Sequence, residues 1–297
     1  MAYDVMDNLK SKTINCLDHG HVTLVDCMPR LVPDDQRTSD YAIVQSARVS
    51  YGDGTKTLNE DRGLIRYLMR HKHTTPFEMC EFKFHCKMPI FVARQWIRHR
   101  TANVNEYSGR YSILKDEFFI PDAARQQSVN NKQGGDKKLD EETNKEFSSY
   151  LSSFCSEAYS KYESLLEKGI SRELARISLP VNLYTEWYWK IDLHNLLHFL
   201  ALRCDSHAQY EIRVFADAML DLIKPIVPIS IEAWEDYNDH RGGVKLTRLE
   251  VDAIKSTLNK IREVHPDVGC SLGSISSENK REQQEWAAKA ATLGFGE

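Results

Sequence analysis

The chain has 297 residues, of which 41% are apolar, 10% aromatic and 28% charged, and its formal net charge is −4. This composition predicts a soluble globular protein and excludes a chain that is disordered throughout. No apolar run approaches the ~18 residues of a membrane span, and residues 1–12 lack the apolar stretch of a secretion signal, so we expect an intracellular, cytoplasmic protein. The acidic balance also disfavours bulk attraction to nucleic acid or to an anionic membrane.

The seven cysteines are odd in number and scattered along the chain, with no Cys-x-x-Cys pair. This usage argues against a disulfide framework and against a thiolate zinc site. We therefore expect reduced thiols.

A strand and two helices are predicted near the amino terminus, at residues 19–28, 39–50 and 59–70. Ser39 and Asp40 form a cap for the first helix, and Gly52 and Gly54 mark the turn after it. Residues 71–78 have neither helical nor strand periodicity, and Pro76 favours an extended backbone before it, so a loop is expected there.

Strict alternation of apolar and polar residues predicts a half-buried strand over residues 80–88. Two of its cysteines then belong to the core, and His85 lies on the outer face. Pro89 opens a helix that carries Arg94 and Arg98 on one side.

The segment from Arg98 to Tyr111 is the most unusual stretch of the sequence. Together with Arg94 it contains four arginines and one acid, Glu106, a local balance of 4 − 1 = +3 in an acidic chain. Guanidinium groups grip planar anions through two parallel hydrogen bonds, so a phosphate group is the first candidate ligand. An ordinary solvated face fits less well, because apolar and amide residues interrupt the charges.

The second half of the chain is predominantly helical by pattern. Residues 125–146 are polar and predict a mobile loop without a function. Helices are expected at residues 139–168, 171–179 and 206–225, and a strand at 184–191. Asp192 caps a further helix, and Val251, Ile254, Leu258 and Ile261 mark an amphipathic one.

Helices outnumber strands, and strands do not alternate one for one with helices. The expected fold class is therefore α+β, mainly helical with an antiparallel sheet. The polar stretch from residue 245 onward has only a weak helical pattern and is expected to be an appendage or an oligomer contact.

Other kinds of site are possible on the same sequence. His194 and His198 share one helix face, but no third zinc ligand is evident, so no metal site is expected. Ser108 lacks the glycine-framed elbow of a serine nucleophile, and Cys204 lies in a helical pattern typical of a buried thiol. Arginines interleaved with Trp96, Tyr107 and Tyr111 also resemble a single-strand nucleic-acid platform, although their confinement to one short segment favours a nucleotide.

The triplet Arg98-His99-Arg100 with Ser108 resembles the signature of the flavin-dependent thymidylate synthases, the ThyX family. Four further segments resemble those of the family in the same order: residues 91–96, 73–78, 172–180 and 202–209. The resemblance spans roughly residues 20–225. It implies a ThyX-like fold, with a synthase domain at residues 1–235 that contains the 125–146 loop, and a helical extension at residues 236–297.

The resemblance implies an enzyme that methylates dUMP to dTMP in de novo dTMP biosynthesis. Methylenetetrahydrofolate donates the carbon, NADPH reduces FAD, the reduced flavin donates hydride, and tetrahydrofolate is released. The family forms homotetramers with active sites at subunit interfaces and uses no cysteine nucleophile. No nucleic-acid or membrane partner is implied. The remaining alternatives are a flavoprotein acting on another pyrimidine nucleotide and a single-stranded nucleic-acid binder.

The resemblance also assigns roles to individual residues. The residues implied to contact dUMP are Gln95, Arg98, Glu106, Ser108, Gly109, Arg110, Arg176 and Arg203. Arg203 is implied to be catalytic, because it would meet the uracil ring and favour its electron-rich form. The residues implied to contact FAD are His73, Thr75, Arg98, His99, Arg100, Glu106, Asp192, His194 and His198. A carboxylate would be repelled by a flavin phosphate, so we expect Asp192 to use its backbone or to face a ribose hydroxyl.

Overall fold

The computed structural model describes residues 2–4, 12–33, 38–49, 58–129, 134–237, 246–265, 275, 277 and 279–295. The chain divides into two compact units, Met1–Arg241 and Gly242–Glu297. The predicted turn at Gly52 and Gly54 lies outside the described residues. In the described ranges, no helix is both long and apolar enough to cross a membrane.

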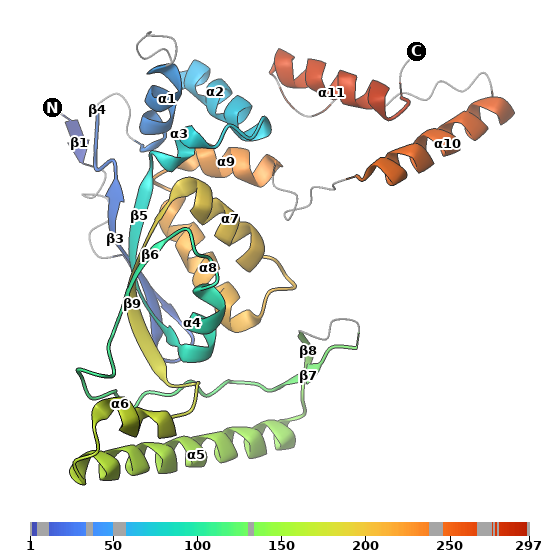
Figure 1. The fold of residues 1–297 in the computed structure, drawn as a ribbon. Coiled ribbons are helices and arrows are strands. Elements are labelled where there is room, and N and C mark those ends of the chain that lie inside the picture. Colours follow the sequence, from blue (N-terminus) through green and yellow to red (C-terminus); the bar gives the residue numbers. More distant parts are fainter. Residues whose placement is uncertain are drawn as a thin grey trace. The chain divides into compact units, whose positions relative to one another are not determined.

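A five-stranded antiparallel sheet is the centre of the first unit (Figure 1). Its strands, in spatial order, are β2 (Thr13–Cys16), β3 (Gly20–Met28), β5 (Glu81–Pro89), β9 (Tyr184–Asp192) and β6 (Asn103–Glu106). The predicted strands at residues 19–28, 80–88 and 184–191 are thus confirmed. The α+β class is confirmed as well.

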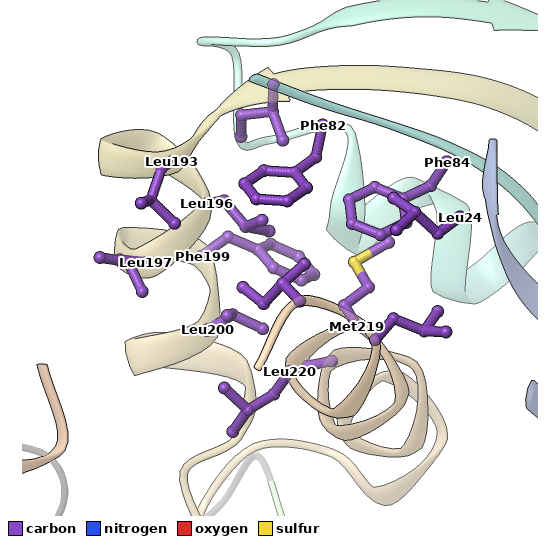
Figure 2. Packing of buried hydrophobic residues seen from close by; sticks show 14 of the residues in the cluster. Leu24, Phe82, Phe84, Leu193, Leu196, Leu197, Phe199, Leu200, Met219 and Leu220 are labelled. Carbon is purple, nitrogen blue, oxygen red and sulfur yellow. The ribbon is translucent and has the colours of Figure 1, made fainter. Parts of the chain in front are cut away.

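One face of this sheet is apolar because the strands alternate. In β5 the side chains of Phe82, Phe84, Cys86 and Met88 are buried, while the residues between them are partly exposed. Two helices pack on that face, α7 (Leu193–Arg203) and α8 (Tyr210–Ile223). Figure 2 shows Phe82 and Phe84 pointing from the sheet toward leucines of α7 and Met219 of α8. Burial of large side chains such as these contributes about 1.5–3 kcal/mol each to folding.

Other helices complete this core. They are α1 (Asp40–Arg48), α2 (Leu58–Arg70), α3 (Thr75–Glu78), α4 (Ile90–Trp96) and α9 (Pro228–Tyr237). The helices expected at residues 39–50 and 59–70 are confirmed. The predicted side-chain cap of α1 is wrong, because Ser39 donates to the carbonyl of Pro29 and Asp40 accepts from Ser230. The loop expected at residues 71–78 contains α3, because Pro76 lies in the first turn of a helix, where its missing N–H costs nothing. Helix α8 begins at Tyr210, four residues later than expected.

A second apolar cluster forms around α5 (Glu141–Glu167). This long helix packs with α6 (Arg172–Ala175) and the 3₁₀ turn η3 (Arg176–Ser178), which together replace the single helix expected at residues 171–179. Tyr162 is fully buried here, and its hydroxyl accepts a hydrogen bond from the backbone of Leu114. Gly169, with a φ of +79°, follows α5 as the sequence predicted.

Two small strand pairs lie outside the main sheet. β1 (Ala2–Asp4) pairs with β4 (Leu31–Pro33), and β7 (Arg125–Gln127) pairs with β8 (Gly135–Lys138). The second pair corrects the expectation that residues 125–146 form no regular structure. Their mobility stays a prediction.

The second unit contains α10 (Arg248–Val264) and α11 (Lys280–Thr292). Helix α10 confirms the predicted amphipathic helix. It begins with a capping box in which Thr247 and Glu250 satisfy each other's backbone N–H groups. The weak helical pattern near the carboxyl end does correspond to a helix, α11, which Asn279 caps.

Candidate active site

The basic segment runs from the end of α4 into the edge strand β6. Trp96, fully buried against Trp187, Trp189 and Phe199, fixes the end of the helix. The segment then emerges at the surface, where Arg98 and Arg100 are exposed. Within the described residues neither guanidinium has a hydrogen-bonding or ionic partner. Unpaired cations held at one place are suited to bind an anion.

His99 points the other way and meets α7. The Nε of Arg203 donates a hydrogen bond to the Nε2 of His99 at 3.0 Å, and the ring of Phe199 lies edge-on to the imidazole at 4.9 Å. Burial, then the charges of Arg203 and His198, lower the pKa of His99 to about 4. Burial also lowers the pKa of Arg203.

The contact defines the chemical state of both side chains. His99 is neutral at pH 7, and because its Nε2 accepts, its proton resides on Nδ1. In the described part of the chain the guanidinium of Arg203 has no other partner, so its remaining N–H groups are available to a ligand. A partly buried cation of this kind stabilises negative charge that develops nearby.

A hollow of about 240 Å³ lies between α2, α3, α7 and α9. His73, His194 and His198 line it together with apolar and aromatic side chains, among them Phe77, Leu197, Trp234 and Tyr237. The rings of His99 and His198 are 6.4 Å apart. The structure therefore brings four of the predicted FAD residues into one neighbourhood. Thr75 is the first residue of α3, which contributes Phe77 to the same hollow.

Asp192 has a structural partner of its own. Its carboxylate accepts hydrogen bonds from the backbone N–H of Asn195 at 2.9 Å and from the Asn195 side chain at 2.7 Å. This confirms the predicted helix cap. The contact of Asp192 with FAD stays a prediction.

A second group of predicted residues lies where β6 leads into a turn. Glu106 accepts a hydrogen bond from Thr185 Oγ1 at 2.8 Å, which fixes its carboxylate at the sheet edge. The backbone N–H of Arg110 donates to Ser108 Oγ at 3.3 Å, and Arg110 Nε pairs with Glu173 at 3.2 Å. Among the described residues, no base contacts Ser108 Oγ.

Gly109 allows the turn to approach η3. A Cβ at this position would lie 3.1 Å from Leu114 and 3.3 Å from the Cδ of Arg176. The turn and the exposed Arg176 are therefore close neighbours. Ser108, Arg110 and Arg176 form a surface with the donors that a phosphate group requires.

The two groups lie beside different apolar clusters. The first, around His99 and Arg203, packs on the sheet core, and the second, around Ser108 and Arg176, belongs to the cluster around Tyr162. In the residues that the structure describes, no hydrogen bond or ion pair joins them.

Gln95 is linked to residues that the sequence did not assign a role. Its side-chain amide donates to Gln209, which in turn donates to the buried Glu211. Arg125 pairs with Glu211 from the opposite side. Gln209 closes the segment 202–209 noted in the sequence, whereas nothing in the pattern around Arg125 indicated this contact.

The alternative sites receive no support from the geometry. No group of three or more potential metal ligands occurs among the described residues. Cys204 follows α7 as its carboxyl cap. Cys80 and Cys86 are buried, and burial raises the pKa of both thiols. Neither Cys80 nor Cys86 is therefore an activated nucleophile.

The site residues fit a flavin nucleotide in chemical terms. The hollow offers aromatic and aliphatic surface for a ring system, and its imidazoles offer hydrogen-bonding groups at the rim. The exposed guanidinium groups of Arg98 and Arg100 carry the positive charge that a diphosphate would require.

Comparison with known proteins gives a consistent result. A family model described as thymidylate synthase complementing protein matches residues 30–229. The flavin-dependent thymidylate synthase of Dictyostelium discoideum is 55% identical over 294 residues, which cover 98% of this chain and 90% of the relative. That of Wolbachia pipientis is 56% identical over 237 residues, 79% of this chain and 80% of the relative.

Solved structures are similar as well. The UMP/dUMP methylase PolB of Streptomyces cacaoi, bound with 5-Br dUMP, matches with a TM-score of 0.66 and 33% identity. The match covers 76% of this chain and 98% of PolB. The fold, the arginine-rich segment and the extent of these matches agree: the chain belongs to the family of flavin-dependent thymidylate synthases.

Proposed function

We propose that the protein methylates dUMP to dTMP, with methylenetetrahydrofolate as carbon donor and NADPH as reductant of FAD. The observation that carries the proposal is the segment Arg98–Arg110, in which exposed arginines without partners in the described chain flank a neutral His99 held by Arg203. FAD, when reduced, supplies the hydride. The protein's own task is to bind and orient the reactants.

The residues divide between these tasks. Ser108, Arg110 and Arg176 would bind the phosphate of dUMP, and Gln95, Glu106 and Gly109 would contact the rest of the nucleotide. Arg203 would hold the uracil ring and stabilise negative charge on its oxygens, as its free N–H groups and its burial favour. His73, Thr75, His99, Asp192, His194 and His198 would contact FAD, while Arg98 and Arg100 would bind its diphosphate.

A homotetramer with shared active sites is part of the proposal. The two groups of site residues lack a direct contact within one chain. Apolar side chains beside the second group are exposed, with Ile177 74% and Val181 62% accessible. An exposed apolar patch next to an incomplete site favours burial against another subunit.

We also propose that the synthase domain corresponds to residues 1–235 and that residues 236–297 are an extension. The division between the compact units at Arg241 supports this boundary. The family match, which ends at residue 229, supports it independently. An intracellular enzyme fits the proposed substrates.

The test begins with the visible spectrum of the purified protein after FAD is added and the excess removed. Retained flavin that NADPH bleaches without oxygen, at a rate that dUMP alters, is the expected result. Product analysis then follows dTMP formation with methylenetetrahydrofolate. Failure to retain flavin, together with no thermal shift on adding dUMP, would overturn the proposal.

UMP is the second candidate substrate, because the similar protein PolB is a UMP/dUMP methylase. The chain is more similar to the thymidylate synthases, with 55% and 56% identity, than to PolB. This similarity supports dUMP over UMP as the substrate. Parallel assays with the two nucleotides at equal concentration decide between them.

A further inference from the structure

A chain of polar side chains leads from the predicted substrate residue Gln95 to a buried ion pair. Gln95 lies on α4, Gln209 precedes α8, Glu211 is in the first turn of α8, and Arg125 begins β7. Nε2 of Gln95 donates to Oε1 of Gln209, and Nε2 of Gln209 donates to Oε2 of Glu211 at 2.9 Å. Nη2 of Arg125 donates to the other oxygen of Glu211.

We call the side chains of Gln95, Gln209, Glu211 and Arg125 the relay. Its ionised member, Glu211, determines which way the amide groups of Gln209 and Gln95 are turned. A carboxylate paired with Arg125 can only accept hydrogen bonds, so Gln209 has to present its NH₂ group to Glu211. The carbonyl oxygen of Gln209 therefore faces Gln95, and Gln95 has to present its own NH₂ group in return. The orientation of nitrogen and oxygen in both amides thus follows from the charge of Glu211.

The side-chain carbonyl oxygen of Gln95 takes no part in the relay. Within the described residues it accepts no hydrogen bond, and a reversed amide would place two carbonyl oxygens against each other. Glu211 is only 3% exposed, so water cannot easily replace the missing partner if the relay is broken.

We propose that Arg125, Glu211 and Gln209 are positioning residues that keep the oxygen of Gln95 directed at dUMP, where it accepts a hydrogen bond from a donor of the nucleotide. The inference rests on the proposed function. dUMP has two such donors outside its phosphate, the N3–H of uracil and the 3′-hydroxyl. Because the oxygen of Gln95 is fixed as an acceptor, the affinity for dUMP should depend on one of these two donors.

The test measures dissociation constants of the FAD-loaded enzyme for three nucleotides: dUMP, 3-methyl-dUMP and 2′,3′-dideoxyuridine 5′-monophosphate. The wild type should lose about tenfold in affinity for the analogue that lacks the relevant donor. Which analogue is affected identifies the donor. Equal affinity for all three nucleotides would overturn the proposal.

Glu211→Gln then tests the relay at constant shape. An amide at residue 211 can donate as well as accept, so the direction of Gln209 and Gln95 is no longer imposed. We expect the affinity of the variant for dUMP to be about tenfold lower than that of the wild type. Its affinity for the affected analogue should equal that of the wild type. The variant should therefore bind dUMP and this analogue almost equally well. Loss of discrimination, and not weaker binding alone, separates positioning from general damage.

Glu117→Gln is the matched control. Glu117 is a partly buried glutamate paired with Lys87 at 2.7 Å, away from the relay, and its replacement should leave discrimination intact. If Glu211→Gln does not fold, Gln209→Ala interrupts the same relay at a less buried position. A folded variant of either kind that keeps the wild-type ratio of dissociation constants would contradict the proposal. If the wild type binds no dUMP at all, the proposed function itself fails, which is a different result.

Discussion

Arg203 and His99 show how a single hydrogen bond assigns roles at the residue scale. By accepting from Arg203, the imidazole remains neutral, and the other N–H groups of the guanidinium have no partner among the described residues. Ser108 has no such partner and lies in the turn beside Arg110. Replacing Arg203 and replacing Ser108 should therefore have different effects on the kinetics of the enzyme.

Arg203→Ala should reduce turnover about 100-fold or more, because it removes a positive charge at the place where negative charge develops. Ser108→Ala should weaken dUMP binding about tenfold and leave measurable turnover at saturating dUMP. Steady-state kinetics with varied dUMP separates the two effects. Complete loss of activity in Ser108→Ala with normal dUMP binding would restore serine as a nucleophile.

His99 should also give the folded protein a characteristic pH dependence. The unfolded histidine takes up a proton near its ordinary pKa of 6.5, whereas the folded one resists protonation down to about 4. Its contribution to the free energy of unfolding is therefore complete above pH 6.5 and is lost as the pH falls toward 4. His99→Gln, which can still accept from Arg203, should remove this contribution.

The measurement is denaturant unfolding of the two proteins between pH 4 and 7, at fixed protein and FAD concentrations. The difference between them is the decisive quantity, because Asp40 has the opposite effect: burial raises its pKa to about 6, so its contribution is lost as the pH rises. A difference that does not vary with pH would show that His99 is not held neutral.

At the scale of secondary structure, Asp192 connects the sheet to the site. It ends β9 and caps α7, the helix that carries His194, His198 and Arg203. Asp192→Ala should lower the free energy of unfolding by about 1 kcal/mol, whereas Asp192→Asn, which retains a side-chain acceptor, should cost only a few tenths. Thermal or denaturant unfolding measures both.

Asp140→Ala is the control for this prediction, because Asp140 caps α5 in the same way at an exposed position. It should destabilise the protein without changing FAD affinity. If Asp192 contacts FAD as proposed, Asp192→Ala should weaken FAD binding as well. Equal destabilisation by Asn and Ala at residue 192 would argue against the cap.

At the scale of the whole molecule, active sites shared between subunits predict how assemblies of two different variant chains behave. Arg203→Ala and Arg176→Ala should each be inactive alone. When the two chains are co-expressed, random assembly should restore both arginines in about one quarter of the sites, provided that the two residues of a site come from different chains. Activity per tetramer, measured on assemblies purified through tags on both chains, tests this.

The control is co-expression of Arg203→Ala with His99→Ala. These two residues contact each other within one chain, so no mixed assembly can restore the pair. No recovery is expected there. Absence of recovery in the Arg203 and Arg176 mixture, despite verified mixed tetramers, would mean that each site is built within one chain.

The sequence by itself determined the elements whose pattern is local. Alternation in β5, the proline before α4 and the aspartate before α7 all act over a few residues, and all were correctly predicted. The arginine-rich segment was evident for the same reason, since its charges are adjacent in the chain and repel one another unless a ligand binds them. Short elements such as α3 and β7 were missed because three or four residues are too few to establish a period.

Tertiary structure decided which of these residues act together. The contact of His99 with Arg203 joins positions 104 residues apart, and the one between Arg125 and Glu211 joins positions 86 apart. Neither contact leaves a trace in local periodicity, because it depends on how α4, α7, α8 and β7 pack. The same packing places Ser108 and Arg176 beside a different apolar cluster from Arg203, although all three belong to one proposed site. The sequence therefore indicated which residue types bind and react, whereas the burial and orientation of each side chain could be learned only from the folded chain.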